Sequence, residues 1–229
     1  ADLSVVFEDE HVLVIDKPAG MPVHPSQGHY ENTLANGIAW YYRNEATPFV
    51  FRAVNRLDRD TSGLVLLAKN PYSSCVLSDA VKDHTIHREY AAIVSGKTDA
   101  SGTIDLPIAR KDGSTIERVC DPERGETAVT HYRTFAYNKD ADISFIRLLL
   151  ETGRTHQIRV HMKAIGHPLP GDFLYCPDYR FIDRQPLHST YLRFSHPVTG
   201  EKLEFSASLP EDMRKLFPDI KNPSGPVFF

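Results

Sequence analysis

Residues 64–68, Leu-Val-Leu-Leu-Ala, form an uninterrupted apolar run directly behind a polar turn. The run is short and bounded by turn residues, so it predicts a buried β-strand. The six residues before it, 58–63, are Asp, Arg, Asp, Thr, Ser and Gly. Such side chains can hydrogen-bond their own backbone and glycine tolerates a positive φ, which favours a tight turn. The sequence therefore predicts a charged lip, Arg56, Leu57 and Asp58, at the entrance to a core strand.

The carboxylate of Asp58 has two interpretations from these residues alone. Loops fixed by a rigid element often hold binding or catalytic groups. The neighbouring Arg56 and Arg59 would keep Asp58 ionised, because nearby cations favour the charged form. However, an Asp-x-Asp pair before Thr-Ser-Gly is also an ordinary capped turn, and the residues alone favour that simpler interpretation.

The composition bounds the class of protein. A chain of 229 residues can hold one sizeable core or two small ones, and 41% apolar and 24% charged residues are ordinary globular values. It has no apolar run long enough to cross a bilayer and no basic-then-apolar leader, so we expect a soluble protein with no membrane partner. Cys75, Cys120 and Cys176 form no Cys-x-x-Cys pair. They predict free thiols in a reducing cytoplasm rather than disulfides or a cysteine-built zinc site.

Charge is distributed unevenly along the chain. The net charge of -4 argues against a protein that coats nucleic acid, because non-specific binding depends on neutralising phosphates. Residues 1–16 hold five acids and neither Lys nor Arg, whereas residues 147–163 hold four bases against the single acid Glu151. A surface that faces phosphate is therefore expected in the second of these segments.

Capping and turn signals predict the order of helices and strands. Asn70 followed by Pro71 is a strong helix start, and Gly166 with Pro168 should end a helix that Thr155 caps. The other expected elements are strands at 4–7, 12–16, 89–96, 127–137, 143–150 and 203–207, helices from Thr33 to about 42 and at 210–217, and a mobile hairpin or loop up to 126.

Arg154 lies in the tight turn between the strand at 143–150 and the following helix. An arginine held there can reach a carboxylate on the lip of a neighbouring strand. The alternative is a capped amphipathic helix whose bases, Arg159 and Lys163, are solvated.

Two stretches resemble the motifs of a known family. Residues 56–64, RLDRDTSGL, resemble the R-L-D-x-x-T-S-G-L signature of the RluA-type pseudouridine synthases, which modify ribosomal and transfer RNA. Residues 152–161, TGRTHQIRVH, resemble the T-G-R-T/S-H-Q-I/L-R-V-H motif of the same family. Further matches, among them DKPAGMPVHPS, GTIDLPIAR and FSHPVTGE, follow in the family order and cover nearly the whole chain.

The resemblance implies a fold. We expect one α+β pseudouridine synthase catalytic domain over residues 1–229, with a mixed, mostly antiparallel β-sheet flanked by helices and a central active-site cleft. The extra N-terminal RNA-binding module of the S4 type, which some relatives carry, is expected to be absent, because the catalytic segment begins almost at Ala1.

The resemblance also implies an activity, the isomerisation of specific uridines in ribosomal or transfer RNA to pseudouridine without cofactor or metal. Asp58 would be catalytic, Arg154 would pair with it, and Tyr90 would meet the target base. Arg56 would fill the place of the flipped-out uridine or hold a phosphate, because a base inside a helix cannot be reached. The other expected RNA-binding residues are His156, Gln157 and Arg159. We expect a cytoplasmic monomer with RNA as its partner.

Three positions depart from the family pattern. Asn55 stands where the family usually has His, and an amide cannot titrate near neutrality, so we expect no proton transfer at this position. Pro170 and Cys176 differ from the family's usual L-G-D-x-x-Y-G sequence, so the resemblance does not imply the detailed structure of that loop.

Two other functions are alternatives to this one. A metal-dependent hydrolase could use Asp58, Asp60, Asp172 and some of the histidines, but the sequence has no H-E-x-x-H or comparable ligand spacing. A non-catalytic RNA-binding protein of the same fold is the other alternative. The presence of Asp58, Arg154 and Tyr90 argues against it.

Overall fold

The computed structural model describes residues 3–25, 30–45, 49–220 and 225–228. Its contacts divide the chain into two units, each discontinuous in sequence. The first unit holds the residues up to His87 together with Ser189–Ala207, and the second holds Arg88–His188 together with the residues from Ser208 on. That the two units form a single domain stays a prediction.

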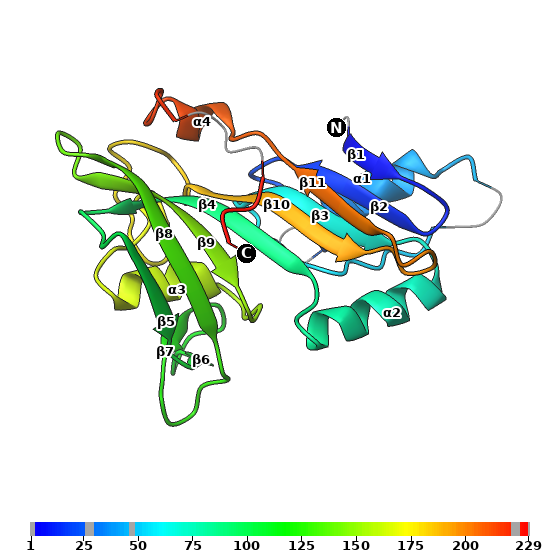
Figure 1. The fold of residues 1–229 in the computed structure, drawn as a ribbon, viewed down its shortest axis with the longest axis horizontal. Coiled ribbons are helices and arrows are strands. Elements are labelled where there is room, and N and C mark those ends of the chain that lie inside the picture. Colours follow the sequence, from blue (N-terminus) through cyan, green and yellow to red (C-terminus); the bar gives the residue numbers. More distant parts are fainter. Residues whose placement is uncertain (1–2, 26–29, 46–48, 221–224, 229) are drawn as a thin grey trace. The chain divides into compact units, whose positions relative to one another are not determined.

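The first unit contains a sheet and two helices (Figure 1). The strand order is β1-β2-β3-β10, and β11 pairs with β10. The registers of β1 with β2, β2 with β3, and β10 with β11 are antiparallel. The bounds are β1 Ser4–Glu8, β2 Val12–Lys17, α1 Leu34–Tyr41, β3 Ser62–Ala68, α2 Pro71–Lys82, β10 Leu187–Ser195 and β11 Lys202–Ser206. Strand β10 enters this unit at Ser189.

Strand β3 lies at the core of the first unit. All seven of its residues are buried, as the apolar run predicts. Because successive side chains of a strand point to opposite faces, both faces of β3 are covered. Leu64 and Leu66 pack with Val12 and Val14 of β2 and with Leu77 of α2, and full burial of each such side chain contributes about 1.5–3 kcal/mol.

Both helices of the first unit begin at their predicted caps. The Thr33 hydroxyl accepts the Asn36 backbone N–H in a capping box. The Asn70 side chain accepts the backbone N–H of Ser73 at 2.8 Å, with Pro71 as the first residue of α2. These caps satisfy N–H groups that the first helical turn leaves unpaired, and the predicted helices are confirmed.

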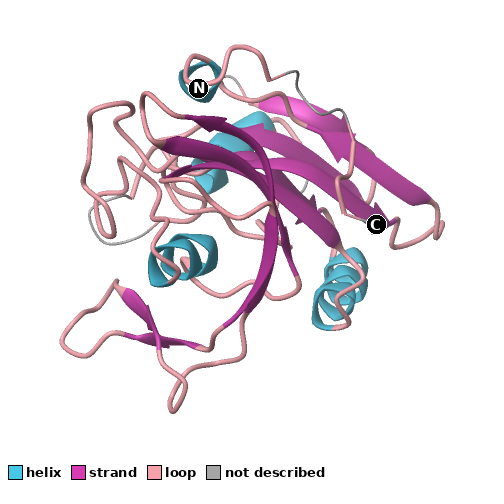
Figure 2. Ribbon diagram, turned by 60° about the vertical axis from the view of Figure 1, so that its left-hand side comes forward, coloured by secondary structure: helices cyan, strands magenta, loops and turns pink. Residues whose placement is uncertain are grey.

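The second unit contains a sheet of order β4-β9-β8-β5 in which every pairing is antiparallel. Strands β6 and β7 form a separate two-stranded hairpin. Strand β7 lies in the polar stretch where a hairpin or loop was expected, and β6 lies just before that stretch. Figure 2 shows the strands in magenta and the few short helices in cyan. The bounds are β4 His87–Ser95, β5 Ser101–Asp105, β6 Ile108–Arg110, β7 Arg118–Cys120, β8 Val129–Asn138, β9 Ile143–Leu150, α3 Gln157–Ala164 and α4 Glu211–Arg214.

A buried ion pair lies within the sheet of the second unit. Glu89 Oε2 accepts a hydrogen bond from Arg147 Nη2 at 2.6 Å, and both side chains are 0% exposed. The backbone N–H groups of Val227 and Phe228 also donate to Glu89 Oε1, each at 3.0 Å. The segment 225–228 is therefore held to the sheet by a carboxylate that accepts its backbone N–H groups.

The structure corrects some local predictions. Helix α3 begins at Gln157, and its N-cap residue is His156 in the left-handed region (φ 58°), so Thr155 is not the cap. Strands β5 and β10 had not been predicted as strands. The first six residues of β10 are all buried, and such a strand lacks the alternation that marks a half-exposed one.

The end of α3 was predicted correctly. Gly166 has a φ of 85°. The N–H groups of Gly166 and His167 return to the carbonyls of Lys163 and Met162 at 3.0 and 2.8 Å, which is a Schellman motif. Within the described residues, no helix combines the length and apolar character needed to span a membrane.

Candidate active site

Asp58 lies on a loop of the first unit, residues 55–61, which we call the aspartate loop. It leads directly into β3. Arg56 and Arg59 are exposed, Asp58 is half-buried, and Leu57 between them is only 7% exposed. The buried leucine therefore anchors a loop whose two arginines, Arg56 and Arg59, are exposed.

The start of the aspartate loop is attached to β3 through a side chain. Asn55 is 5% exposed. Its Oδ1 accepts the N–H of Leu66 at 2.7 Å, and its Nδ2 donates to the carbonyl of Leu64 at 3.2 Å.

The far side of the loop is attached to a buried lysine. Lys17 is 0% exposed, and its Nζ donates to the carbonyls of Pro18 and Met21 at 2.8 Å and of Arg59 at 3.0 Å. A further bond from the Thr61 N–H to the Asp58 carbonyl, at 3.1 Å, closes the turn. The backbone on either side of the Asp58 side chain is thus fixed.

Gly63 ends the turn at a point where only glycine fits. Its φ is 108°, and a Cβ added there would lie 2.2 Å from the carbonyl oxygen of Ser189 in β10. The close approach of the β3 backbone to β10 thus depends on the absence of a side chain. The positive φ expected of a glycine in this turn is confirmed.

The second unit carries Tyr90 and Arg154. Tyr90 lies in β4 opposite Leu148 of β9 and is 5% exposed. Arg154 precedes α3, as predicted. Its Nε donates to the carbonyl of Thr127 at 3.0 Å, and its Nη1 pairs with the exposed Glu126 at 2.7 Å. The predicted pairing of Arg154 with Asp58 stays a prediction.

Gln157 holds the turn that carries Arg154. It is 3% exposed. Its Oε1 accepts from the Thr152 hydroxyl at 2.8 Å and from the Arg154 N–H at 3.0 Å. Its Nε2 donates to the Val129 carbonyl at 3.0 Å and to the Thr130 hydroxyl at 2.9 Å. All four hydrogen-bonding positions of the amide are used within the protein, which favours a structural role over the predicted contact with RNA.

Arg159 and His156 also have partners within the protein. Arg159 donates to both oxygens of Asp172, at 2.6 and 2.8 Å, and the side chains are 2% and 0% exposed. A buried, doubly bonded guanidinium favours a structural role, and the RNA contact predicted for Arg159 stays a prediction. His156 is half-buried, and its Nδ1 is hydrogen-bonded to the Tyr175 hydroxyl at 2.8 Å.

The supporting roles of Asn55, Lys17 and Gln157 were not predicted from the sequence. Lys17 lies in the DKPAG motif and Gln157 in TGRTHQ, so both were within recognised motifs, but no local pattern gives their distant partners. Among the described residues, no group of three or more His, Cys, Asp or Glu side chains is arranged to hold a metal ion.

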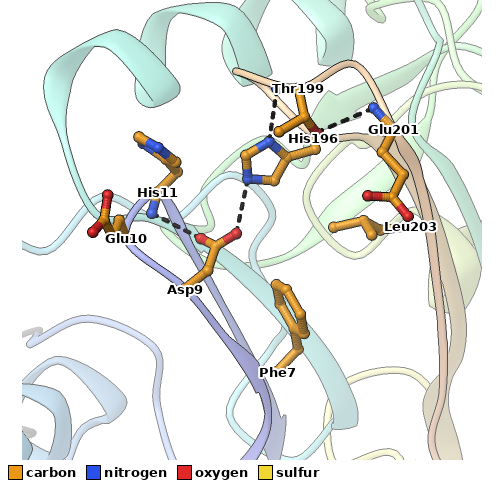
Figure 3. A pocket seen from close by; sticks show the side chains of 8 residues that line it. All are labelled: Phe7, Asp9, Glu10, His11, His196, Thr199, Glu201 and Leu203. Carbon is orange, nitrogen blue, oxygen red and sulfur yellow. Dashed lines mark hydrogen bonds and ion pairs between the residues drawn. The ribbon is translucent and has the colours of Figure 1, made fainter.

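A cavity of about 240 Å³ lies in the first unit, and Figure 3 shows the side chains that line it. Its lining includes the hydrogen bond between His196 Nε2 and Asp9 Oδ2, at 2.9 Å. In the register of β2 and β3, Val12 pairs with Ala68 and Lys17 with Gly63. The lining residues Asp9, Glu10 and His11 lie between β1 and Val12, next to the Ala68 end of β3. The cavity is therefore at the opposite end of β3 from the aspartate loop. The lining residues are Phe7, Asp9, Glu10, His11, His196, Thr199, Glu201 and Leu203.

Comparisons with known proteins agree with the motifs. A family model described as RNA pseudouridylate synthase matches residues 11–164. The "Uncharacterized RNA pseudouridine synthase YjbO" of Bacillus subtilis is 46% identical over 215 residues, which cover 93% of this chain and 75% of that protein. The "Ribosomal large subunit pseudouridine synthase D" of Zymomonas mobilis is 42% identical over 235 residues, covering 94% and 72%.

Solved structures show the same likeness. "Human RNA Pseudouridylate Synthase Domain Containing 1" has a TM-score of 0.74 at 26% identity, with 90% of this chain and 83% of that chain covered. "Human RNA Pseudouridylate Synthase Domain Containing 4" shares the fold, with a TM-score of 0.72 at 22% identity and coverage of 91% and 89%.

The chain belongs to the RNA pseudouridylate synthase family. Within this family it is of the RluA type, as its motifs predicted, and it is an RNA-modifying isomerase, a pseudouridine synthase. The predicted α+β fold with a mostly antiparallel sheet is confirmed.

Proposed function

We propose that this pseudouridine synthase isomerises specific uridines of large-subunit ribosomal RNA, with Asp58 as its catalytic carboxylate. The ribosomal substrate is supported by the names of similar proteins from Zymomonas mobilis and Pseudomonas aeruginosa, which are 42% and 40% identical to this chain.

The reaction requires one well-placed carboxylate. The bond between N1 and C1′ of uridine breaks, a bond between C5 and C1′ forms, and a proton is lost from C5 while N1 gains one, so the atoms balance without water. A carboxylate can attack or stabilise the electron-poor centre that appears as the glycosidic bond weakens. The observation that carries the proposal is the fixed loop backbone around Asp58, held by Asn55 and Lys17. A group fixed in advance needs little reorganisation during the reaction.

Three other residues support this chemistry in the proposal. Arg154 pairs with Asp58 and keeps it anionic. Its present partner, Glu126, is 72% exposed, and exposed ion pairs contribute little stability, about 0–1 kcal/mol. The guanidinium can therefore exchange one carboxylate for another at small cost. Tyr90 contacts the target base, and the exposed Arg56 takes the place that the base vacates or holds a phosphate.

The proposal includes the state of the substrate and of the enzyme. The target uridine is flipped out of its helix or already unpaired, because its C5 and C1′ atoms cannot be reached within a stack. The enzyme acts as a monomer in the cytoplasm.

Pseudouridine mapping of total RNA tests the proposal. Cells that lack this gene should lose pseudouridine at specific positions of large-subunit ribosomal RNA, and the wild-type gene should restore them, whereas Asp58→Ala should restore none. Asp79→Ala is the matched control, because Asp79 is a 60% exposed aspartate on α2, and it should restore every position.

Two results would contradict the proposal. Restoration of all positions by Asp58→Ala would make Asp58 structural. Loss of positions in transfer RNA alone would make the ribosomal assignment wrong while leaving the catalytic residue in place.

A further inference from the structure

We infer that Asn55 is a positioning residue for Asp58, because its side-chain amide takes the place of a peptide group beside β3 and fixes the start of the aspartate loop. The inference rests on the proposed catalytic role of Asp58.

The segment before the aspartate loop runs along β3. The Ala68 N–H donates to the Arg52 carbonyl at 2.9 Å, and the Val54 N–H donates to the Leu66 carbonyl at 2.8 Å. Ala53 forms an antiparallel bridge with Leu67. The backbone contacts of this segment with β3 thus follow one another along the strand as far as Val54.

The Asn55 side chain continues these contacts. It takes the Leu66 N–H on its oxygen, at 2.7 Å, and gives a hydrogen bond to the Leu64 carbonyl from its nitrogen, at 3.2 Å. The main chain is thereby free to leave the strand and turn through Leu57 and Asp58, while β3 keeps its hydrogen bonds.

An amide suits this position for a chemical reason. It presents one acceptor and one donor side by side, as a peptide group does, whereas a carboxylate has no donor and the two nitrogens of an imidazole point in different directions. Asn55 is 5% exposed, so water cannot readily replace either bond, and a buried strand N–H left unpaired is unfavourable. Without the amide the loop start has to move so that water or another group can reach Leu66.

The first test is Asn55→Ala in the full chain. We expect the single-turnover rate of pseudouridine formation to fall about a hundredfold, because a displacement of a reacting group by about 1 Å can cost this much. The affinity for the RNA should fall by much less than the rate. Hydrogen exchange at the Leu66 amide should become faster.

Asn70→Ala is the matched control. It removes the same side chain at the other end of β3, with loss of the bond from Ser73 N–H at 2.8 Å and the contact with His11 at 3.1 Å. We expect a comparable loss of stability but a wild-type rate. A rate loss equal to that of Asn55→Ala would mean that stability alone explains the effect and would overturn the inference.

Asn55→Asp adds a readout that a purely structural role would not give. At neutral pH its carboxylate faces the Leu64 carbonyl without a donor, whereas protonation supplies an O–H in place of the amide N–H. The rate relative to wild type at the same pH should therefore rise as the pH is lowered from about 8 to about 6, since burial raises the pKa of a carboxyl group. A constant ratio would count against the inference.

Wild type and Asp58→Ala are measured on the same RNA. If wild type is active and Asp58→Ala is not, an Asn55→Ala rate equal to wild type overturns only the positioning role. If wild type forms no pseudouridine, or Asp58→Ala remains active, the proposed function fails, and the inference that rests on it fails with it.

Discussion

At the scale of single residues, the buried ammonium group of Lys17 joins two turns of the first unit. It donates hydrogen bonds to the carbonyls of Pro18, Met21 and Arg59. Lys17→Met keeps the apolar stem and removes the donor. Since a hydrogen bond to a charged group contributes about 1.5–3 kcal/mol, we expect the free energy of unfolding in urea to fall by about 3 kcal/mol, with slower catalysis. An unchanged free energy of unfolding would show that the ammonium group is not required.

His161 should make stability depend on pH. It is fully buried, and its Nε2 is hydrogen-bonded to the Leu106 carbonyl at 2.8 Å. Burial lowers the pKa of His161 from its usual 6.5. The unfolded chain therefore takes up a proton before the folded protein does. The contribution of neutral, buried His161 to stability is therefore fully present above about pH 6.5, the usual pKa of histidine. It is lost as the pH falls through the lower pKa that His161 has in the folded protein. Urea unfolding at about pH 7.5 and about pH 5.5 measures the effect.

The variant His161→Gln cannot titrate, so its loss of stability between the two pH values should be smaller than that of wild type. Equal losses would show that other groups cause the dependence.

Several residues of the site could be predicted from motifs, but their partners could not. Asp58 and Arg154 lie within recognisable motifs. The Asp172 that neutralises Arg159 is 13 positions away, and Lys17 bonds to a carbonyl 42 positions away. A motif identifies which residue types stand at a site, whereas the hydrogen-bond and ion-pair partners of those residues depend on tertiary packing. For the same reason the sequence did not predict the bonds of Asn55 to β3, and the absence of proton transfer at Asn55 stays a prediction.

At the scale of elements, Gly63 tests how closely β3 and β10 must approach. Gly63→Ala would place a Cβ 2.2 Å from the Ser189 oxygen. Backbone atoms cannot yield as a flexible side chain can, so we expect a loss of more than about 4 kcal/mol or no folded protein. In Gly200→Ala, where φ is 71° and nothing lies within 4 Å, only backbone strain of about 1–2 kcal/mol is expected. Thermal unfolding compares the two variants, and similar losses would contradict the steric argument.

Elements defined by local chemistry were predicted well. The caps at Thr33 and Asn70 and the stop at Gly166 act on neighbouring residues, so the sequence contains the necessary information. Strand β10 was missed because its burial comes from distant parts of the chain. The start of α3 was placed too early, because the left-handed His156 has no sequence signal of its own.

At the scale of the whole molecule, the order of family motifs predicted the fold class, because it extends over nearly the entire chain. The division into two units was not predicted. It depends on the return of Ser189–Ala207 to the first unit, and no change of composition marks that return in the sequence.

The discontinuity of both units determines the order of events during synthesis. Proteins are made from the N-terminus, and domains that are continuous in sequence can fold one after another as they emerge. Here β3 lacks β10 until Ser189 and its successors have been added, and the core of the second unit lacks Leu209, Met213 and Phe217 until later still. The nascent chain therefore cannot complete one unit before the other has been almost fully translated, and both reach their final packing only as translation of this segment ends.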